Sequence, residues 1–246
     1  MKYQKTYKEF VDGFEKIQQE ITRINRNETI DEILKEDNNN NNNNMSIFEQ
    51  TEKIESDQLV CHSGGAKGSD TIWENITDSY GGSTKAYSYQ TKYHNGSNKV
   101  EISESDYQEG VREIHKANKF LKRNVSYYMN LLARNWSQVK YSEQIFAIGY
   151  IVEPGEKGTR YVNKSKYQEV DGGTGYCVKM GIVNGRPIYV FEQNLNKWFE
   201  WSYVTEKYIE CETPVISKKN FAGVGTRNIT QNGINAIKEL FEKTFK

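Results

Sequence analysis

Three glycine-rich turns contain the residues of this chain that are best suited to bind an anion. They comprise Ser63, Gly64, Gly65, Ala66, Gly68, Ser69 and Asp70, then Gly172, Gly173, Thr174 and Gly175, and then Gly225, Thr226 and Arg227. Glycine lets backbone N–H groups approach a phosphate, and a helix that starts at the turn adds unpaired donors and the positive end of its dipole. The turns together predict a phosphate-binding cleft, although glycine also serves the geometry of a strand-to-helix turn.

Several side chains of these turns could contribute to the same cleft. Ser63, Ser69 and Thr174 could donate hydroxyl groups to a phosphate, and the last two could equally cap the helices that start there. Asp70 could hold a ribose hydroxyl or act as a base, or it could only complement the helix dipole. Arg227 is suited to pair with a phosphate through two hydrogen bonds.

The histidines and cysteines predict neither a metal centre nor a disulfide framework. The three histidines lack metal-ligand spacing, so we expect no metal and no other cofactor. The cysteines, Cys61, Cys177 and Cys211, are odd in number and widely spaced, which favours a reducing, cytoplasmic compartment. Cys61 and Cys177 are expected to be small packing residues.

Strand-like and helical patterns alternate along residues 57–246. Short apolar runs predict strands at 59–61, 86–89, 145–149, 188–191 and 221–225. The alternation, with glycine turns after strands, predicts an α/β fold: a Rossmann-like three-layer sandwich with a mostly parallel sheet. Such sheets bind ligands beyond the carboxyl ends of their strands, where the strand order reverses. The three turns are therefore expected to meet at one edge of the sheet.

Other segments between these runs also carry recognisable patterns. Residues 103–106 have the form of a capping box and begin a helix. Residues 128–139 predict a second helix with Arg134 near its middle. Residues 153–169 are polar and punctuated by glycine, and we interpret them as an inserted hairpin or flap. Residues 198–201 are interpreted as a short aromatic strand or hairpin.

The N-terminal part of the chain differs in composition from the rest. Residues 1–37 carry apolar side chains at three- to four-residue spacing, which predicts an amphipathic helix that packs on the main domain or on a partner. An unbroken run of asparagines fills residues 38–44. Asparagine competes for its own backbone hydrogen bonds, so we expect residues 38–56 to form an Asn-rich linker. Residues 57–246 then form the main domain.

Composition excludes several classes of function. The chain has 246 residues, with 33 Lys and Arg against 33 Asp and Glu, so its formal net charge is zero. It lacks the basic excess that nucleic-acid or membrane-surface binding requires. No stretch approaches the roughly 20 apolar residues of a membrane span. We therefore expect a small-molecule partner, with no nucleic acid and no membrane.

The glycine turns resemble those of a known superfamily. SGGAKGSD at 63–70 resembles the SGGA-x-G-x-D loop of the SLOG superfamily of Rossmann-like proteins, which includes LOG-type phosphoribohydrolases, molybdenum-cofactor carrier proteins and DprA proteins. DGGTG at 171–175 is similar to the family's PGG-x-GT loop, with Asp171 in place of proline. FAGVGTR at 221–227 looks like the family's first strand and its following turn. Because that strand normally precedes the SGGA loop, the resemblance implies a circular permutation within residues 57–246.

The resemblance implies a nucleotide or nucleotide-derived ligand, and a homodimer in many family members. It also provides a test for enzyme activity. Arg134 is placed like an Arg of the phosphoribohydrolases, whereas Lys179 stands at their catalytic Glu, so Asp70 or Asp171 would have to serve instead. Cleavage of an N-glycoside passes through an oxocarbenium-like state that a carboxylate stabilises. We therefore favour binding by a sensor or carrier over hydrolysis of nucleoside monophosphates, and over an interaction module without a ligand.

Overall fold

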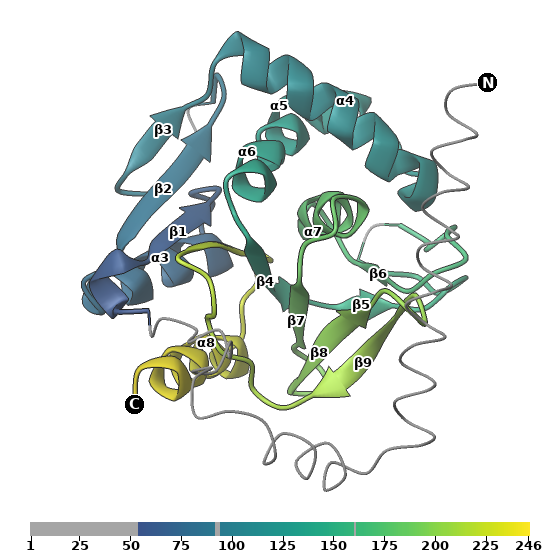
Figure 1. Ribbon diagram of the computed structural model, residues 1–246. Coiled ribbons are helices and arrows are strands. Elements are labelled where there is room, and N and C mark those ends of the chain that lie inside the picture. The colour runs from purple at the N-terminus through teal and green to yellow at the C-terminus, as the bar shows by residue number, and fades with distance from the viewer. Residues whose placement is uncertain (1–53, 92–93, 160) are drawn as a thin grey trace, which may run out of the picture. The chain divides into compact units, whose positions relative to one another are not determined.

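A sheet of eight strands lies at the centre of the folded unit (Figure 1). The computed structural model describes residues 54–91, 94–159 and 161–246, which belong to one compact unit. The helix predicted over 1–37 lies outside the described residues, and so does the predicted linker over 38–56, apart from 54–56. The fold is therefore described for the main domain alone.

The sheet is parallel except at one end. Its strands are β1 (Val60–Ser63), β2 (Ser83–Ser88), β3 (Lys99–Glu101), β4 (Gln144–Gly149), β7 (Ile188–Glu192), β8 (Lys197–Ser202), β9 (Lys207–Cys211) and β10 (Asn220–Gly225). They lie in the order β3-β2-β1-β10-β4-β7-β8-β9, and only the β7–β8 and β8–β9 pairs are antiparallel. β4 is buried along its whole length, as expected of a continuous apolar run in a central strand.

Helices cover both faces of the sheet (Figure 1). They are α3 (Ser69–Ser79), α4 (Glu104–Leu121), α5 (Met129–Ala133), α6 (Asn135–Lys140), α7 (Thr174–Val183) and α8 (Gln231–Phe245), with short 3₁₀ turns η2 (Ser56–Gln58) and η3 (Ser126–Tyr128). On one face, Trp73 of α3 and Phe241 of α8 pack in one apolar cluster. On the other, Ile114 of α4 and Met180 of α7 belong to a second cluster. The predicted three-layer α/β sandwich with a mostly parallel sheet is thus confirmed.

The last strand of the chain lies in the middle of the sheet. β10 pairs in parallel with β1 on one side, where Phe221 is opposite Cys61, and with β4 on the other, where it is opposite Gln144. Ile54 and Phe245 both pack against the apolar cluster to which α3 and α8 contribute. The C-terminal strand is therefore inserted between elements that precede it in the sequence by many residues.

The predicted insertion and the predicted aromatic segment both fold as hairpins. β5 (Ile151–Val152) pairs in antiparallel fashion with β6 (Glu169–Val170), and a bridge between Lys157 and Val162 extends the ribbon beyond them. β8 and β9 form the predicted aromatic hairpin. The predicted capping box also holds, because the Ser103 side chain accepts a hydrogen bond from the N–H of Asp106 at the start of α4.

The prediction of one continuous helix over 128–139 is wrong. α5 ends at Ala133 and α6 begins at Asn135, so Arg134 lies at the junction of two short helices. The N–H of Ser137 donates to the carbonyl oxygen of Arg134, a tight three-residue turn at the point where the helix is interrupted. The short edge strand β3 was not predicted, because its three residues carry no buried alternating pattern.

Candidate ligand-binding cleft

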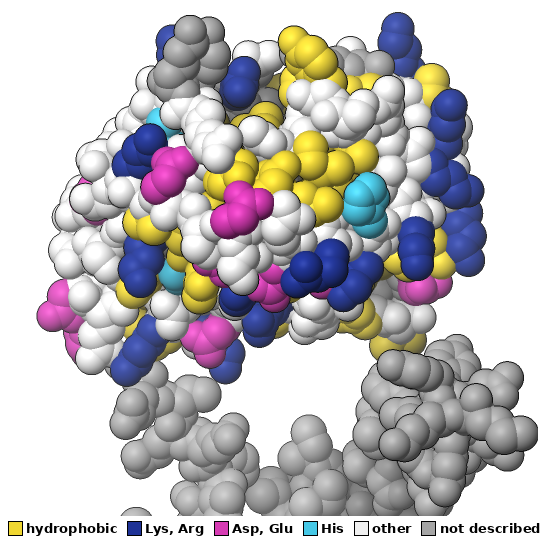
Figure 2. Space-filling view, turned by 90° about the horizontal axis from the view of Figure 1, so that it is seen from above, with side chains coloured by type: hydrophobic (Ala, Val, Ile, Leu, Met, Phe, Trp, Pro, Cys, Tyr) yellow, Lys and Arg dark blue, Asp and Glu magenta, His cyan; other side chains and the backbone are white. Residues whose placement is uncertain are grey.

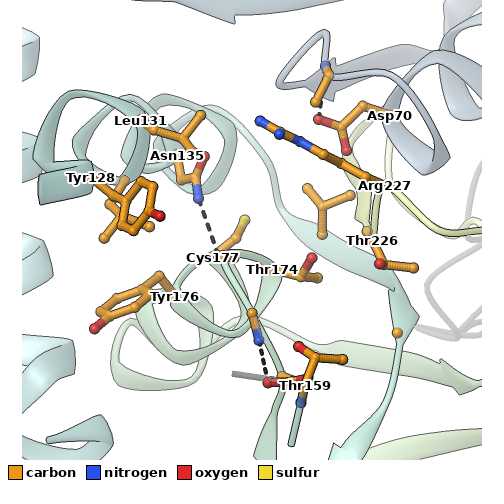
Figure 3. Close-up of a pocket in the computed structure, with 18 of the residues that line it drawn as sticks. Asp70, Tyr128, Leu131, Asn135, Thr159, Thr174, Tyr176, Cys177, Thr226 and Arg227 are labelled. Atoms are coloured by element: carbon orange, nitrogen blue, oxygen red, sulfur yellow. Dashed lines mark hydrogen bonds between the residues drawn. The ribbon is translucent and has the colours of Figure 1, made fainter. Parts of the chain in front are cut away.

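A cleft of about 460 Å³ opens at the carboxyl ends of β1, β10 and β4 (Figure 3). Its size lies within the range of small-molecule sites, and its place at a sheet edge is the one that α/β folds use for ligands. All three glycine turns contribute to its lining. The predicted site residues that line it are Ala66, Asp70, Arg134, Asp171, Gly172, Gly173, Thr174, Gly225, Thr226 and Arg227.

The remaining predicted site residues lie behind the walls of the cleft; they are Ser63, Gly64, Gly65, Gly68, Ser69 and Gly175. The Ser63 hydroxyl donates to Oε1 of Glu74 at 2.6 Å, and the Ser69 hydroxyl donates to the carbonyl oxygen of Thr226 at 2.8 Å. Both hydroxyls are thus used inside the fold, which corrects the expectation that they donate to a phosphate. Ser69 instead ties the first turn to the third.

The first glycine turn binds a carboxylate of the protein itself. The N–H of Ala66 donates to Oδ2 of Asp70 at 3.3 Å, and the N–H groups of Gly64 and Gly225 also stabilise that carboxylate. Burial raises the pKa of Asp70, while the charge of Arg134 and the three N–H groups act in the opposite direction. The turn therefore presents Asp70 to the cleft, where a phosphate had been expected to occupy these donors.

The second glycine turn leads into α7 without a side-chain cap. The N–H of Gly172 binds Asp171 and the N–H of Tyr176 donates to the carbonyl oxygen of Gly173, whereas the N–H groups of Thr174 and Gly175 at the start of the helix have no intrahelical acceptor. Arg123 fixes the turn from behind by donating to the carbonyl oxygens of Gly172 at 3.0 Å and of Val170 at 3.2 Å. No motif marks Arg123 in the sequence. We call this helix N-terminus the anion seat, because its backbone donors suit a negatively charged group.

Arg134 is a buried cation that lines the cleft. It is only 6% exposed, and its guanidinium makes no hydrogen bond or ion pair with the described residues. Burial lowers its pKa, and the nearby charge of Asp70 raises it again. The side chain packs over Gly64, where a Cβ would overlap Nη1. The residue that the resemblance singles out thus lies in the cleft.

Arg227 and Thr174 are the other side chains that could hold an anion. Arg227 is exposed, extends over the cleft (Figure 3), and forms no hydrogen bond or ion pair within the described part of the chain. Its backbone packs against Gly68, where a Cβ would collide with it. The Thr174 hydroxyl lines the cleft in the first turn of α7.

Asp171 organises the second turn. Its Oδ2 accepts the N–H of Thr159 at 2.7 Å and its Oδ1 accepts the N–H of Gly172 at 2.8 Å. These contacts tie the hairpin over 153–169 to the glycine turn. Both carboxylates accept backbone donors, but burial raises the pKa of Asp70, so Asp70 is the better candidate base of the two.

Lys179 points away from the cleft. Its Nζ forms a buried ion pair with Oε1 of Glu169 at 2.9 Å. Aromatic rings surround the same ammonium group, with centroids at 5.3 Å for Trp201, 5.6 Å for Tyr167 and 5.7 Å for Phe120. The position therefore fastens α7 to β6, and it offers the cleft neither a carboxylate nor a charge.

One wall of the cleft is apolar. It is formed by Tyr128 of η3 and by Leu131 and Leu132 of α5, and Asn135 follows at the start of α6 (Figure 3). Hydrophobic side chains gather on the outer face that bears α4 and α5 (Figure 2), and Tyr127 in the preceding turn is 86% exposed. A planar apolar group bound beside this wall would be shielded from water on one side.

Glu74 lies one helical turn below Asp70 and is almost fully buried. Burial raises its pKa to about 7, more than the Ser63 hydroxyl lowers it. The folded pKa exceeds the unfolded value of 4.5, so the protonated form favours folding. The contribution of Glu74 to the free energy of unfolding is complete at low pH. It is lost as pH rises from about 4.5 to about 7.

We expect the Glu74→Gln variant to be more stable than the parent at pH 8 by about 1–3 kcal/mol, and nearly equal to it at pH 5. Glutamine keeps an acceptor for Ser63 but cannot ionise. Urea unfolding at both pH values measures the difference. Glu239→Gln, an exposed change on α8, is the control and should show no such trend. An equal difference at both pH values would contradict the assignment.

Other classes of site find no support in the part of the chain that the structure covers. Among the described residues, no group of three or more His, Cys, Asp and Glu side chains could hold a metal ion. No helix found there is long and apolar enough to cross a membrane. In comparisons with known proteins, no family model, no curated protein and no solved structure matches this chain.

Proposed function

We propose that this protein binds a nucleotide or a nucleotide-derived molecule through its phosphate group. Arg134 carries the proposal. A buried charge is normally paired, because removing it from water without a partner costs several kcal/mol. Arg134 is buried, lines a cleft of ligand size and has no hydrogen-bonding partner among the described residues. A ligand that accepts hydrogen bonds, through a phosphate or a hydroxyl oxygen, would supply that partner.

The phosphate would lie at the N-terminus of α7. The N–H groups of Thr174 and Gly175 have no intrahelical acceptor, the Thr174 hydroxyl is adjacent, and Arg227 extends over the same cleft. A helix N-terminus and arginine side chains are the donors that proteins use most for phosphate. The apolar wall at Tyr128 and Leu131 would accept a planar base.

The same features support the proposal that the chain is a permuted member of the SLOG superfamily. The strand that the family places first corresponds to β10, and β10 lies beside β1, whose turn has the SGGA form. Its following turn, with Thr226 and Arg227, faces the cleft.

Hydrolysis of an N-glycoside is the second candidate function. Asp70 favours it, since this carboxyl lies in the cleft near Arg134 and burial raises its pKa. Lys179 disfavours it, because the family's catalytic position is occupied by a buried ion pair with Glu169. We therefore prefer binding by a sensor or carrier. An interaction module without a ligand would leave Nη1 of Arg134 without a hydrogen-bond acceptor.

Ligand release and thermal stability test this function on the full chain. The purified protein is denatured and the supernatant is examined by mass spectrometry, while the folded protein is heated with nucleosides and with their mono-, di- and triphosphates. We expect at least one phosphate-bearing compound to raise the melting temperature when its nucleoside does not. No released compound and no shift with any phosphate would overturn the proposal. Ribose release that Asp70→Asn abolishes would establish the hydrolase instead.

Gly173→Val should remove phosphate binding without unfolding the protein. Gly173 has ordinary helical φ and ψ of −66° and −31°, and the nearest atom to a Cβ there is Leu132 Cδ2 at 4.0 Å. Valine would thus fit the fold at a cost of at most about 1 kcal/mol and project into the anion seat. We expect affinity to fall about tenfold or more, as measured by titration calorimetry. Unchanged affinity would place the phosphate elsewhere.

A further inference from the structure

Three polar side chains meet on the floor of the cleft at Gly64. The N–H of Gly64 stabilises the carboxylate of Asp70. Arg134 and Gln138 occupy the space where a Cβ of Gly64 would stand, and the nearest atoms to it are Nη1 of Arg134 and Nε2 of Gln138. All three side chains line the cleft. The absence of a side chain at Gly64 therefore allows a carboxylate, a guanidinium and an amide to gather at one point.

Gln138 has no hydrogen-bonding partner in the described structure. It lies on α6 one helical turn after Arg134 and is only 2% exposed. Neither its amide N–H₂ nor its carbonyl oxygen bonds to a described residue, whereas Asn135 on the same helix donates to the carbonyl oxygen of Gly173 at 3.4 Å. Buried amides nearly always have partners. Gln138 therefore points to a ligand group that both accepts and donates.

The three side chains together specify the chemistry of that group. The guanidinium of Arg134 only donates, the carboxylate of Asp70 accepts, and the Gln138 amide does both. A phosphate on this floor would suit Arg134 but would face the like charge of Asp70. An ammonium group would suit Asp70 but would face Arg134. A hydroxyl group donates to an acceptor such as the carboxylate of Asp70 and accepts from a donor such as the guanidinium of Arg134, so neighbouring hydroxyls satisfy all three side chains.

We infer that the floor of the cleft is a sugar subsite, in which Gln138, with Asp70 and Arg134, binds neighbouring hydroxyl groups of a phosphorylated sugar. The inference rests on the proposed function and adds an orientation to it. The sugar lies on the floor between α3 and α6. Its phosphate points outward to the N-terminus of α7. Gln138 is then a ligand-binding residue that the glycine turns do not reveal.

Titration calorimetry of the full chain with three probes tests this subsite: inorganic phosphate, ribose 5-phosphate and 2-deoxyribose 5-phosphate. We expect ribose 5-phosphate to bind at least about tenfold more tightly than inorganic phosphate, and the deoxy compound to bind between the two. Gln138→Leu should remove most of the advantage of ribose 5-phosphate and change the affinity for inorganic phosphate by less than about twofold. Gln231→Leu, an exposed change on α8, should alter none of the affinities.

The outcomes separate this inference from the function on which it rests. If ribose 5-phosphate binds no more tightly than inorganic phosphate, or if Gln138→Leu weakens both equally, the sugar subsite is refuted while phosphate binding stands. If none of the probes binds and no nucleotide stabilises the protein, both fail together. The Gln138→Leu variant and the parent protein should have the same unfolding curve. In that case, loss of the preference for ribose 5-phosphate over inorganic phosphate results from the change in the cleft and not from unfolding.

Discussion

The Arg134→Gln variant is expected to lose about 100-fold in affinity for the phosphate-bearing ligand. A hydrogen bond to a charged group contributes about 1.5–3 kcal/mol, and the guanidinium of Arg134 has no protein partner that would compete with the ligand for its donors. Glutamine retains some hydrogen-bonding capacity but removes the positive charge beside Asp70. Titration calorimetry, with whichever nucleotide gives the largest thermal shift, measures the loss.

A matched arginine provides the control for this change. Arg112 is exposed on α4 and does not line the cleft, so Arg112→Gln should leave the affinity unchanged. Loss of the guanidinium also removes the attraction that holds down the pKa of Asp70, so the binding that remains should depend on pH differently from that of the parent. An Arg134→Gln protein that binds as tightly as the parent would refute the role of the buried cation.

Gly175→Val should destabilise the protein by about 3 kcal/mol or more. Gly175 lies in the first turn of α7, where a Cβ would overlap the carbonyl oxygen of Val170. That atom belongs to the backbone of β6 and is held by Arg123, so it cannot yield without disturbing the second glycine turn. Overpacking against a fixed backbone is among the few single changes with effects of this size.

Gly173→Val is the matched control, because the same residue type is changed two positions earlier in the same turn. The space around a Cβ at Gly173 is open. The urea concentration at the midpoint of unfolding should therefore fall strongly for Gly175→Val and only slightly for Gly173→Val. If both variants unfold at the same urea concentration, the close approach of α7 to β6 does not explain why residue 175 is glycine.

The layers and the glycine turns could be predicted because local patterns encode them. The run over 145–149 is apolar throughout because β4 is buried on both faces, and glycine marks the turns that follow strands. The role of the first turn could not be predicted in the same way. Its N–H groups bind the carboxylate of Asp70, and this contact depends on how α3 folds back toward the turn. The spacing of residues in the sequence does not show which anion these donors will bind.

The deepest residues of the candidate site were also beyond sequence reasoning. Arg134 is buried because the helix is interrupted at that residue, and no proline or glycine marks the interruption. Gln138 joins the site only because α6 packs over Gly64. Glu169 lies at the end of a polar segment, and nothing in the sequence pattern distinguishes it from its neighbours. In the structure it forms the buried ion pair with Lys179. Each of these contacts joins segments that are distant in the sequence.

The central position of β10 has a consequence for synthesis of the protein. During translation β1, α3, β2 and β4 leave the ribosome long before the strand that must separate β1 from β4. Contacts between Cys61 and Phe221 close a very long loop, and such contacts form late and slowly. The nascent chain therefore carries an unfilled gap in its sheet and only two walls of its cleft. The cleft is complete only after residue 227 has been made, and chaperones are expected to hold the growing chain until then.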